Sequence, residues 1–120
     1  MNVGQSIWLC KRLYENDEGV IVYDEPKEYK LKFNYLTINA MSGYIATIQY
    51  GEQLSKVWKL KAKRPFFDNV FSEGDLLYIN GNEPNTKDVG YVNGDNANAM
   101  VTSVLPHLVS YSITLERIEP

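Results

Sequence analysis

The chain has one cysteine and one histidine in 120 residues, and each shortage excludes a class of protein. A single thiol, Cys10, cannot form an intramolecular disulfide, so the sequence does not fit a disulfide-stapled secreted scaffold. His107 has no cysteine or second histidine near it in sequence, which leaves a zinc site without a ligand set. The glycines form no phosphate-binding pattern either. We therefore expect no metal and no cofactor, and a reducing compartment.

Long apolar runs are missing as well. No stretch approaches the roughly 18–20 apolar residues of a membrane-spanning helix, so we expect no membrane partner. The N-terminal sequence MNVGQSIWLCKRLYEN has no basic stretch ahead of an apolar one, which argues against a secretory signal. The net charge of −3 argues against non-specific binding of nucleic acid. Together these absences predict a soluble protein that stays inside the cell that makes it.

The chain is rich in the alternation of apolar and polar residues that is typical of half-buried strands. Nine tyrosines, a residue type that favours strands, add to this tendency. Four segments show the alternation: 30–35, 44–50, 58–63 and 109–116. After Tyr35 the apolar residues change register to Leu36 and Ile38, and such a slip inside a strand predicts a bulge or bend. A turn is expected at Ser42-Gly43, just before the second of these segments.

Four shorter runs complete the set of expected strands: 6–14, 19–23, 75–80 and 99–105. The first two flank the turn-prone segment 15–19, which predicts a hairpin. Segment 64–72 could hold one helical turn, with Pro65 in its first turn. About seven or eight strands at short spacing predict a single all-β domain over 1–120, a small antiparallel β-barrel or sandwich.

The segment 81–98, GNEPNTKDVGYVNGDNAN, is the most unusual part of the chain. Connections longer than about 12–15 residues are uncommon in compact domains and are usually functional or disordered. Its acidic residues do not match a calcium loop, and Asn93-Gly94-Asp95 favours a tight turn. We expect this loop to contact a partner or to line a channel, with these candidate residues: Asn82, Glu83, Asn85, Asp88, Tyr91, Val92, Asn93 and Asp95. The alternative is a loop that is mobile in the isolated subunit and becomes ordered on assembly.

A basic segment forms the second candidate surface, and its members are Lys56, Lys59, Lys61, Lys63 and Arg64. Such a strand, with aromatic residues nearby, could contact the phosphates of DNA or an acidic protein neighbour. The simpler interpretation is an edge or solvent-facing strand whose lysines prevent unwanted pairing. An oligonucleotide-binding barrel would use Trp58, Lys59 and Lys61 as its binding platform.

Catalysis has little support in the sequence. Cys10 and His107 could form a nucleophile and base only if they were adjacent in space. Cys10 lies in an apolar strand, where a buried and inert thiol is more common. We expect no catalytic residue and no enzymatic activity.

The order of these features resembles the head-closure, or head-tail connector (stopper), proteins of long-tailed bacteriophages. The resemblance covers nearly the whole chain, as a similarity of layout and short motifs. Its main elements are SIWLCKRLYE, NDEGVIVYDEP, NAMSGYIATIQYGEQLSKVWKL, FSEGDLLYINGNEP with the long insertion after it, and NAMVTSVLPHLVSYSITLERI.

This resemblance implies a structural virion protein, built as a small β-barrel that assembles into a ring, commonly a hexamer. Such a ring lies beneath the portal or its adaptor protein, retains packaged DNA and offers a docking surface for the tail protein. Its location is the head-tail junction of the virion, and the host cytoplasm before assembly. Passing contact with double-stranded DNA in the channel is expected. Some relatives gate the channel with a loop, for which 81–98 and 38–43 are the candidates. The alternative is another tail component, such as a tail terminator or a contractile-injection-system part.

Overall fold

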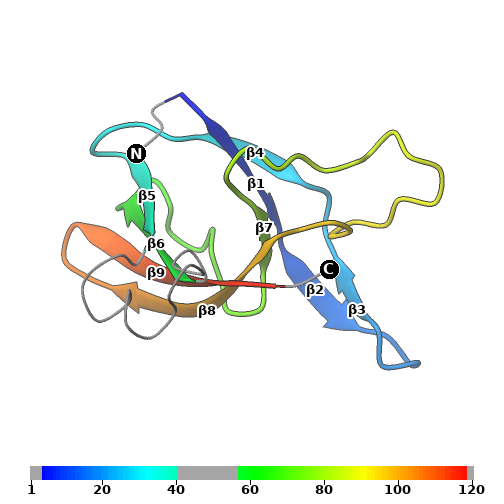
Figure 1. Ribbon diagram of the computed structural model, residues 1–120. Helices are drawn as coiled ribbons and strands as arrows, with labels where there is room; N and C mark the ends of the chain where they lie inside the picture. Colours follow the sequence, from blue (N-terminus) through cyan, green and yellow to red (C-terminus); the bar gives the residue numbers. More distant parts are fainter. Residues whose placement is uncertain (1–3, 41–56, 119–120) are drawn as a thin grey trace, which may run out of the picture.

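The computed structural model describes residues 4–40 and 57–118, which contain nine β-strands and no helix. The strands are β1 (Ser6–Cys10), β2 (Arg12–Glu15), β3 (Ile21–Tyr23), β4 (Lys27–Lys30), β5 (Leu36–Ala40), β6 (Val57–Lys63), β7 (Leu76–Tyr78), β8 (Ala99–Pro106) and β9 (Ser110–Arg117). Seven of them form one antiparallel sheet in the order β4-β1-β7-β8-β9-β6-β5, while β2 and β3 form a separate hairpin. The large sheet curls on itself into a nearly closed barrel (Figure 1). The predicted all-β antiparallel barrel is confirmed.

The barrel closes where the two edge strands of the sheet follow each other in sequence. Between β4 and β5, Lys32 and Leu36 form an isolated antiparallel bridge, with N···O distances of 2.9 and 3.0 Å between their backbones. The Tyr35 carbonyl also accepts a hydrogen bond from the Lys63 amide of β6 at 2.9 Å. The seam between β4 and β5 is therefore fastened at one end.

The single strand predicted from 30 to 38, with a bend after Tyr35, is wrong. β4 ends at Lys30, the chain reverses, and β5 begins at Leu36. The alternation misled because Leu31 is fully buried while Phe33 is 72% exposed, so these two apolar residues do not share a buried face. Asn34 adopts a φ of 59°, which asparagine tolerates in tight turns. The register change after Tyr35 marks a complete chain reversal.

Most of the other expected elements are confirmed. The predicted strands 58–63, 75–80, 99–105 and 109–116 correspond to β6, β7, β8 and β9. The predicted segment 6–14 is split at Lys11 into β1 and β2. Segment 64–72 contains no helix, but it begins with a single helical turn of the predicted kind, in which the Phe67 amide donates to the Lys63 carbonyl four residues earlier at 3.3 Å. The expected turn at Ser42-Gly43 and the strand 44–50 lie outside the described residues.

Two clusters of buried side chains form the core. The larger one fills the barrel with residues Ile7, Leu9, Leu31, Leu36, Ile38, Trp58, Leu60, Ala62, Phe67, Phe71, Leu77, Ile79, Ala99, Val101, Ile113 and Leu115. The smaller one lies on the other face of β1 and β7 and contains Cys10, Leu76, Tyr78 and Ala97. Each fully buried side chain of leucine size contributes roughly 1.5–3 kcal/mol through loss of water contact. The second cluster is the surface on which the hairpin and the long loop are built.

Candidate functional site

The long loop between β7 and β8 has no regular secondary structure, as predicted. Asparagine side chains join its two ends, residues 79–83 and 96–98, which we call the neck of the loop. The side-chain amide of Asn98 pairs with the backbone of Ile79: its Oδ1 accepts from the Ile79 N–H at 2.8 Å, and its Nδ2 donates to the Ile79 carbonyl at 2.9 Å. Asn82 donates to the Asn96 carbonyl at 2.7 Å, and Asn96 donates to the Glu83 carbonyl at 3.1 Å. The asparagines therefore act as a local substitute for a β-ladder.

A buried tyrosine fixes the body of the loop. The hydroxyl of Tyr78, on β7, donates to the Asp95 carbonyl at 2.5 Å and lies 3.0 Å from the Tyr91 hydroxyl. Since a phenol has one proton to donate, Tyr91 is the donor to Tyr78. Burial raises the pKa of Tyr78, so this hydroxyl stays protonated at neutral pH. The Asp95 carboxylate also accepts from the Val92 amide at 2.9 Å.

The loop packs against the hairpin through a glycine. Gly94 has a φ of +97°, and a Cβ atom there would lie 2.9 Å from Leu76 Cδ1 and 3.3 Å from Tyr23 Cδ2. The side-chain Nδ2 of the neighbouring Asn93 donates to the backbone carbonyl of Tyr23, in β3, at 3.3 Å. The tight turn predicted at Asn93-Gly94-Asp95 is confirmed, and it brings the loop and the base of the hairpin into contact.

The predicted contact residues of the loop divide into two groups. Asn82, Tyr91 and Asn93 are partly buried and hydrogen-bonded within the chain, so their polar atoms serve the fold. Five others are exposed to solvent: Glu83, Asn85, Asp88, Val92 and Asp95. Sequence reasoning missed Val89, which is fully exposed at the end of the loop. The available contact surface is therefore the exposed stretch 85–90 together with Val92.

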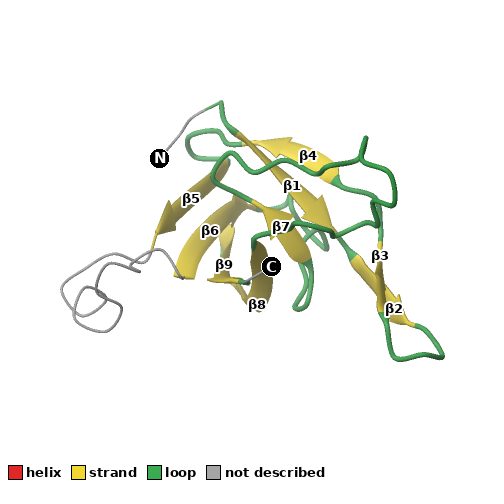
Figure 2. Cartoon of the chain, turned by 45° about the vertical axis from the view of Figure 1, so that its right-hand side comes forward, coloured by secondary structure: helices red, strands yellow, loops and turns green. Residues whose placement is uncertain are grey.

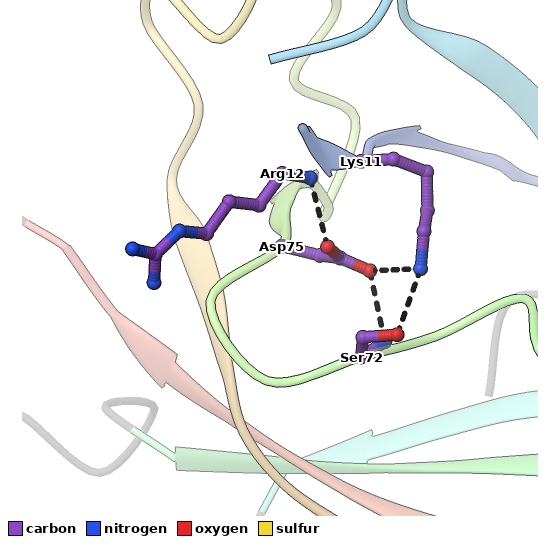
Figure 3. A network of polar contacts seen from close by, with 4 residues as sticks. All are labelled: Lys11, Arg12, Ser72 and Asp75. Carbon is purple, nitrogen blue, oxygen red and sulfur yellow. Dashed lines mark hydrogen bonds and ion pairs between the residues drawn. The ribbon is translucent and has the colours of Figure 1, made fainter. Parts of the chain in front are cut away.

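The hairpin leaves the barrel at a polar network around the buried Asp75 (Figure 3). Asp75 is 1% exposed and accepts hydrogen bonds from Lys11 Nζ at 2.7 Å, the Arg12 amide at 2.9 Å and the Ser72 amide at 2.8 Å. Lys11 Nζ also donates to Ser72 Oγ at 3.0 Å. Because both Lys11 and Arg12 are held by one carboxylate, the chain changes direction there and β2 separates from β1. The sequence offered one signal that was missed, an acidic residue directly before a wholly apolar strand.

Beyond this network the hairpin projects away from the barrel (Figure 2). Its turn is the predicted one at 15–19, where Asn16 Oδ1 accepts from the amides of Glu18 and Val20 at 2.9 and 3.0 Å. Four large apolar side chains on the strands and turn are 36–58% exposed: Leu13, Tyr14, Val20 and Ile21. Acidic residues share this end of the hairpin. Several large apolar side chains exposed beside charged ones are typical of interaction surfaces.

The basic strand faces solvent, as one of the two interpretations predicted, but it is not an edge strand. β6 lies between β5 and β9, with Trp58 buried at 5% exposure and the lysines on the outer face. The Trp58 ring is therefore unavailable for stacking on a base, and that part of the oligonucleotide-binding alternative is wrong. Lys59 donates to Thr114 Oγ1 at 2.6 Å, and Arg64 donates to the His107 carbonyl at 2.8 Å. Lys56 lies outside the described residues.

A groove of about 560 Å³ opens beside the exposed end of this strand. We call it the basic groove, and it is lined by Phe33, Asn34, Tyr35, Thr37, Asn39, Lys61, Lys63, Val109 and Ser110. Phe33 is 72% exposed and Val109 66% exposed, so the groove combines apolar side chains with two exposed ammonium groups. The basic groove is suited to an occupant that is both apolar and acidic.

The two residues considered for catalysis lie in different environments. Cys10 is fully buried, and burial raises the pKa of its thiol to about 11, which keeps it protonated at neutral pH. His107 is exposed in the turn between β8 and β9. Within 4–40 and 57–118, no three His, Cys, Asp or Glu side chains are grouped so that they could share a metal ion. The same residues include no helix long and apolar enough to cross a membrane.

Comparison with known proteins finds no matching family model, no matching curated protein and no matching solved structure. The features that bear on function are the exposed stretch of the loop, the projecting hairpin, the basic groove and the layout of the sequence.

Proposed function

We propose that the protein is a head-tail connector, or head-closure, subunit of a tailed bacteriophage or prophage. It assembles with copies of itself into a ring, retains packaged DNA and provides a docking surface for the tail. Its neighbours in the virion are the portal or adaptor protein and a tail protein. The observation that carries this proposal is a nearly closed barrel with two projections fixed on its second core cluster, the β2–β3 hairpin and the loop 81–98.

A structural subunit of this kind needs constant spacing and contact surfaces that become covered on assembly. The barrel supplies the spacing, and the exposed apolar side chains of the hairpin supply a surface of the second type. The role is assembly and not catalysis, which is consistent with the buried and protonated thiol of Cys10.

The charge of the loop suits a position near DNA without gripping it. Glu83, Asp88 and Asp95 are all exposed, and their carboxylates repel phosphate groups. A channel lined by such loops would let DNA slide past. The loop 81–98 is the better described of the two gate candidates, since the end of 38–43 lies outside the described residues.

The proposal is tested by electron microscopy of particles from a null mutant of the phage that encodes the chain. We expect filled capsids that lose their DNA, beside intact tails that remain unattached. Empty heads with normally attached tails would contradict a head-closure role. Closed, stable heads with malformed tails would favour the alternative of another tail component.

Shortening the loop at its exposed end separates docking from folding. Replacing Thr86–Val89 by two glycines keeps Tyr91 and Asp95, the two partners of the Tyr78 hydroxyl. It removes two turn bonds of the exposed stretch, Asp88 amide to Asn85 carbonyl and Tyr91 amide to Asp88 carbonyl, whose groups can bond to water instead. We expect soluble yield and unfolding free energy to change by less than about 0.5 kcal/mol, because the removed side chains are exposed. Tail attachment, measured by in vitro complementation of null-mutant heads, should fall to background.

The matched control breaks the neck of the loop instead of its end. Asn98→Ala leaves the Ile79 amide and carbonyl without partners and should cost about 1–3 kcal/mol of stability. If the shortened protein attaches tails as well as the unchanged protein does, the loop has no docking role.

A further inference from the structure

The β2–β3 hairpin has the properties of a segment that binds elsewhere. Two-stranded hairpins are marginally stable in water when nothing packs on them. Every residue of β2 is exposed, and the hydrogen bonds that tie the hairpin to the rest of the described structure lie at its base, at Arg12 and Tyr23. Its outer part, residues 13–21, which we call the hairpin tip, keeps four large apolar side chains in solvent. Covering these side chains would stabilise the hairpin and remove apolar surface from water.

The charges of the hairpin tip are complementary to those of the basic groove. The tip carries Glu15, Asp17 and Glu18, all exposed, and the groove carries exposed Lys61 and Lys63. Within the part of the chain that the structure describes, none of these five side chains belongs to an ion pair. Each surface also contains large exposed apolar side chains, Leu13 and Tyr14 on the tip and Phe33 and Val109 in the groove. The two surfaces therefore match in both charge and apolar character.

The two surfaces cannot meet within one molecule. Figures 1 and 2 place the hairpin and β5, which lines the groove, on opposite sides of the barrel. Contact between them needs a second copy, whose own hairpin then remains free for a third. Such a head-to-tail interface closes into a ring when the rotation between copies permits it.

We propose that the hairpin tip of one copy docks in the basic groove of a second copy of this chain. The acidic turn faces Lys61 and Lys63, and the apolar side chains of the tip cover Phe33 and Val109. This inference deepens the proposed function, on which its biological meaning rests, by naming the two surfaces that join neighbouring subunits. The contact itself is a property of the purified chain.

Paired charge reversals test the docking in the full-length protein. One variant carries Asp17→Lys and Glu18→Lys on the tip, and the other carries Lys61→Glu and Lys63→Glu in the groove. We expect sedimentation velocity to show concentration-dependent self-association of the unchanged protein, weakened at least tenfold in each variant. The effect should diminish in high salt, since the charges lie near solvent.

Mixing the two variants gives the decisive result. The basic tip of the first fits the acidic groove of the second, and the acidic tip of the second fits the basic groove of the first. An equimolar mixture should therefore recover the assembly of the unchanged protein, whereas each variant alone does not. A control variant with Lys30→Glu and Lys87→Glu has the same net charge as the groove variant, alters two exposed lysines outside the groove, and should associate normally.

Three results would overturn the docking. The first is a chain that remains monomeric up to about 1 mM, the range of very weak contacts. The second is a mixture of the two variants that fails to assemble although both are folded by circular dichroism. The third is normal self-association of the groove variant together with loss of binding to a single-stranded oligonucleotide, which would identify the groove as a nucleic-acid surface.

The outcome for the phage function is read separately. If each variant loses self-association and the mixture regains it, the docking is supported. If, in addition, the heads of the null mutant close without this protein, head closure is refuted. A null mutant that leaks DNA, with a chain whose variants assemble normally, would support head closure and refute the docking.

Discussion

Asp75→Ala is expected to lower the free energy of unfolding by about 2–4 kcal/mol, because it removes the buried carboxylate that accepts three part-buried hydrogen bonds. The carboxylate accepts from the Lys11 ammonium and from the amides of Arg12 and Ser72. Alanine leaves both amides without this acceptor, and each such loss costs about 1–3 kcal/mol, with the lower end applying to part-buried donors such as these. Lys11 is partly exposed and can turn toward water, which limits its own share of the loss.

Urea unfolding followed by tryptophan fluorescence measures this loss. Glu73→Ala is the matched control, since Glu73 is exposed two residues away in sequence and has no polar contact in the described structure. Its effect should stay within about 0.5 kcal/mol. Hydrogen exchange gives a second measurement, in which Asp75→Ala should expose the amides of β2 and β3 before those of β8 and β9. Similar unfolding free energies for the two variants would mean that the network does not hold the hairpin.

Gly94→Ala is expected to cost about 2–4 kcal/mol, and Gly90→Ala only about 1–2 kcal/mol. Both glycines have positive φ, +97° and +84°, so both substitutions carry the same kind of backbone strain. Only at Gly94 does the added Cβ meet other atoms, at 2.9 Å from Leu76 Cδ1 and 3.3 Å from Tyr23 Cδ2. Leu76 is buried in the second core cluster, which restricts its movement away from the new methyl group.

Thermal unfolding of the two glycine variants measures the difference, and the comparison removes the backbone contribution that they share. We also expect a protease to cleave the loop faster in Gly94→Ala, because the loop no longer packs closely against Tyr23 of β3 and Leu76 of β7. Equal losses in the two variants would show that the loop does not pack against Tyr23 and Leu76 in solution.

The strands of the barrel were predictable where one face is buried and the other is in water. In β6, Trp58, Leu60 and Ala62 alternate with lysines, and burial follows that alternation residue by residue. The same rule failed at 30–35, because a tight turn can also alternate apolar and polar residues. Leu31 belongs to the core and Phe33 to the surface, a difference that depends on how the chain turns to close the barrel.

The candidate surfaces were harder to predict because they depend on contacts between distant residues. The break between β1 and β2 results from Asp75, which lies more than sixty positions after Lys11 in the chain. The length of the loop 81–98 was visible in the sequence, but its internal bonding to Tyr78 was not. Tyr91 and Asn93 were selected as partner contacts because of their residue types, and the fold uses their polar atoms itself.

Tyr23 is the residue where the two projections meet, since it forms the root of the hairpin and a support for the loop. A ligand that displaces Asn93 and Gly94 would disturb their contacts with Tyr23 and so change the energy of the hairpin, and thermodynamic linkage makes this influence equal in both directions. Binding at one projection would then pre-organise or weaken binding at the other. In the proposed assembly, this coupling through Tyr23 would make the affinity for the second neighbour depend on whether the first is already bound.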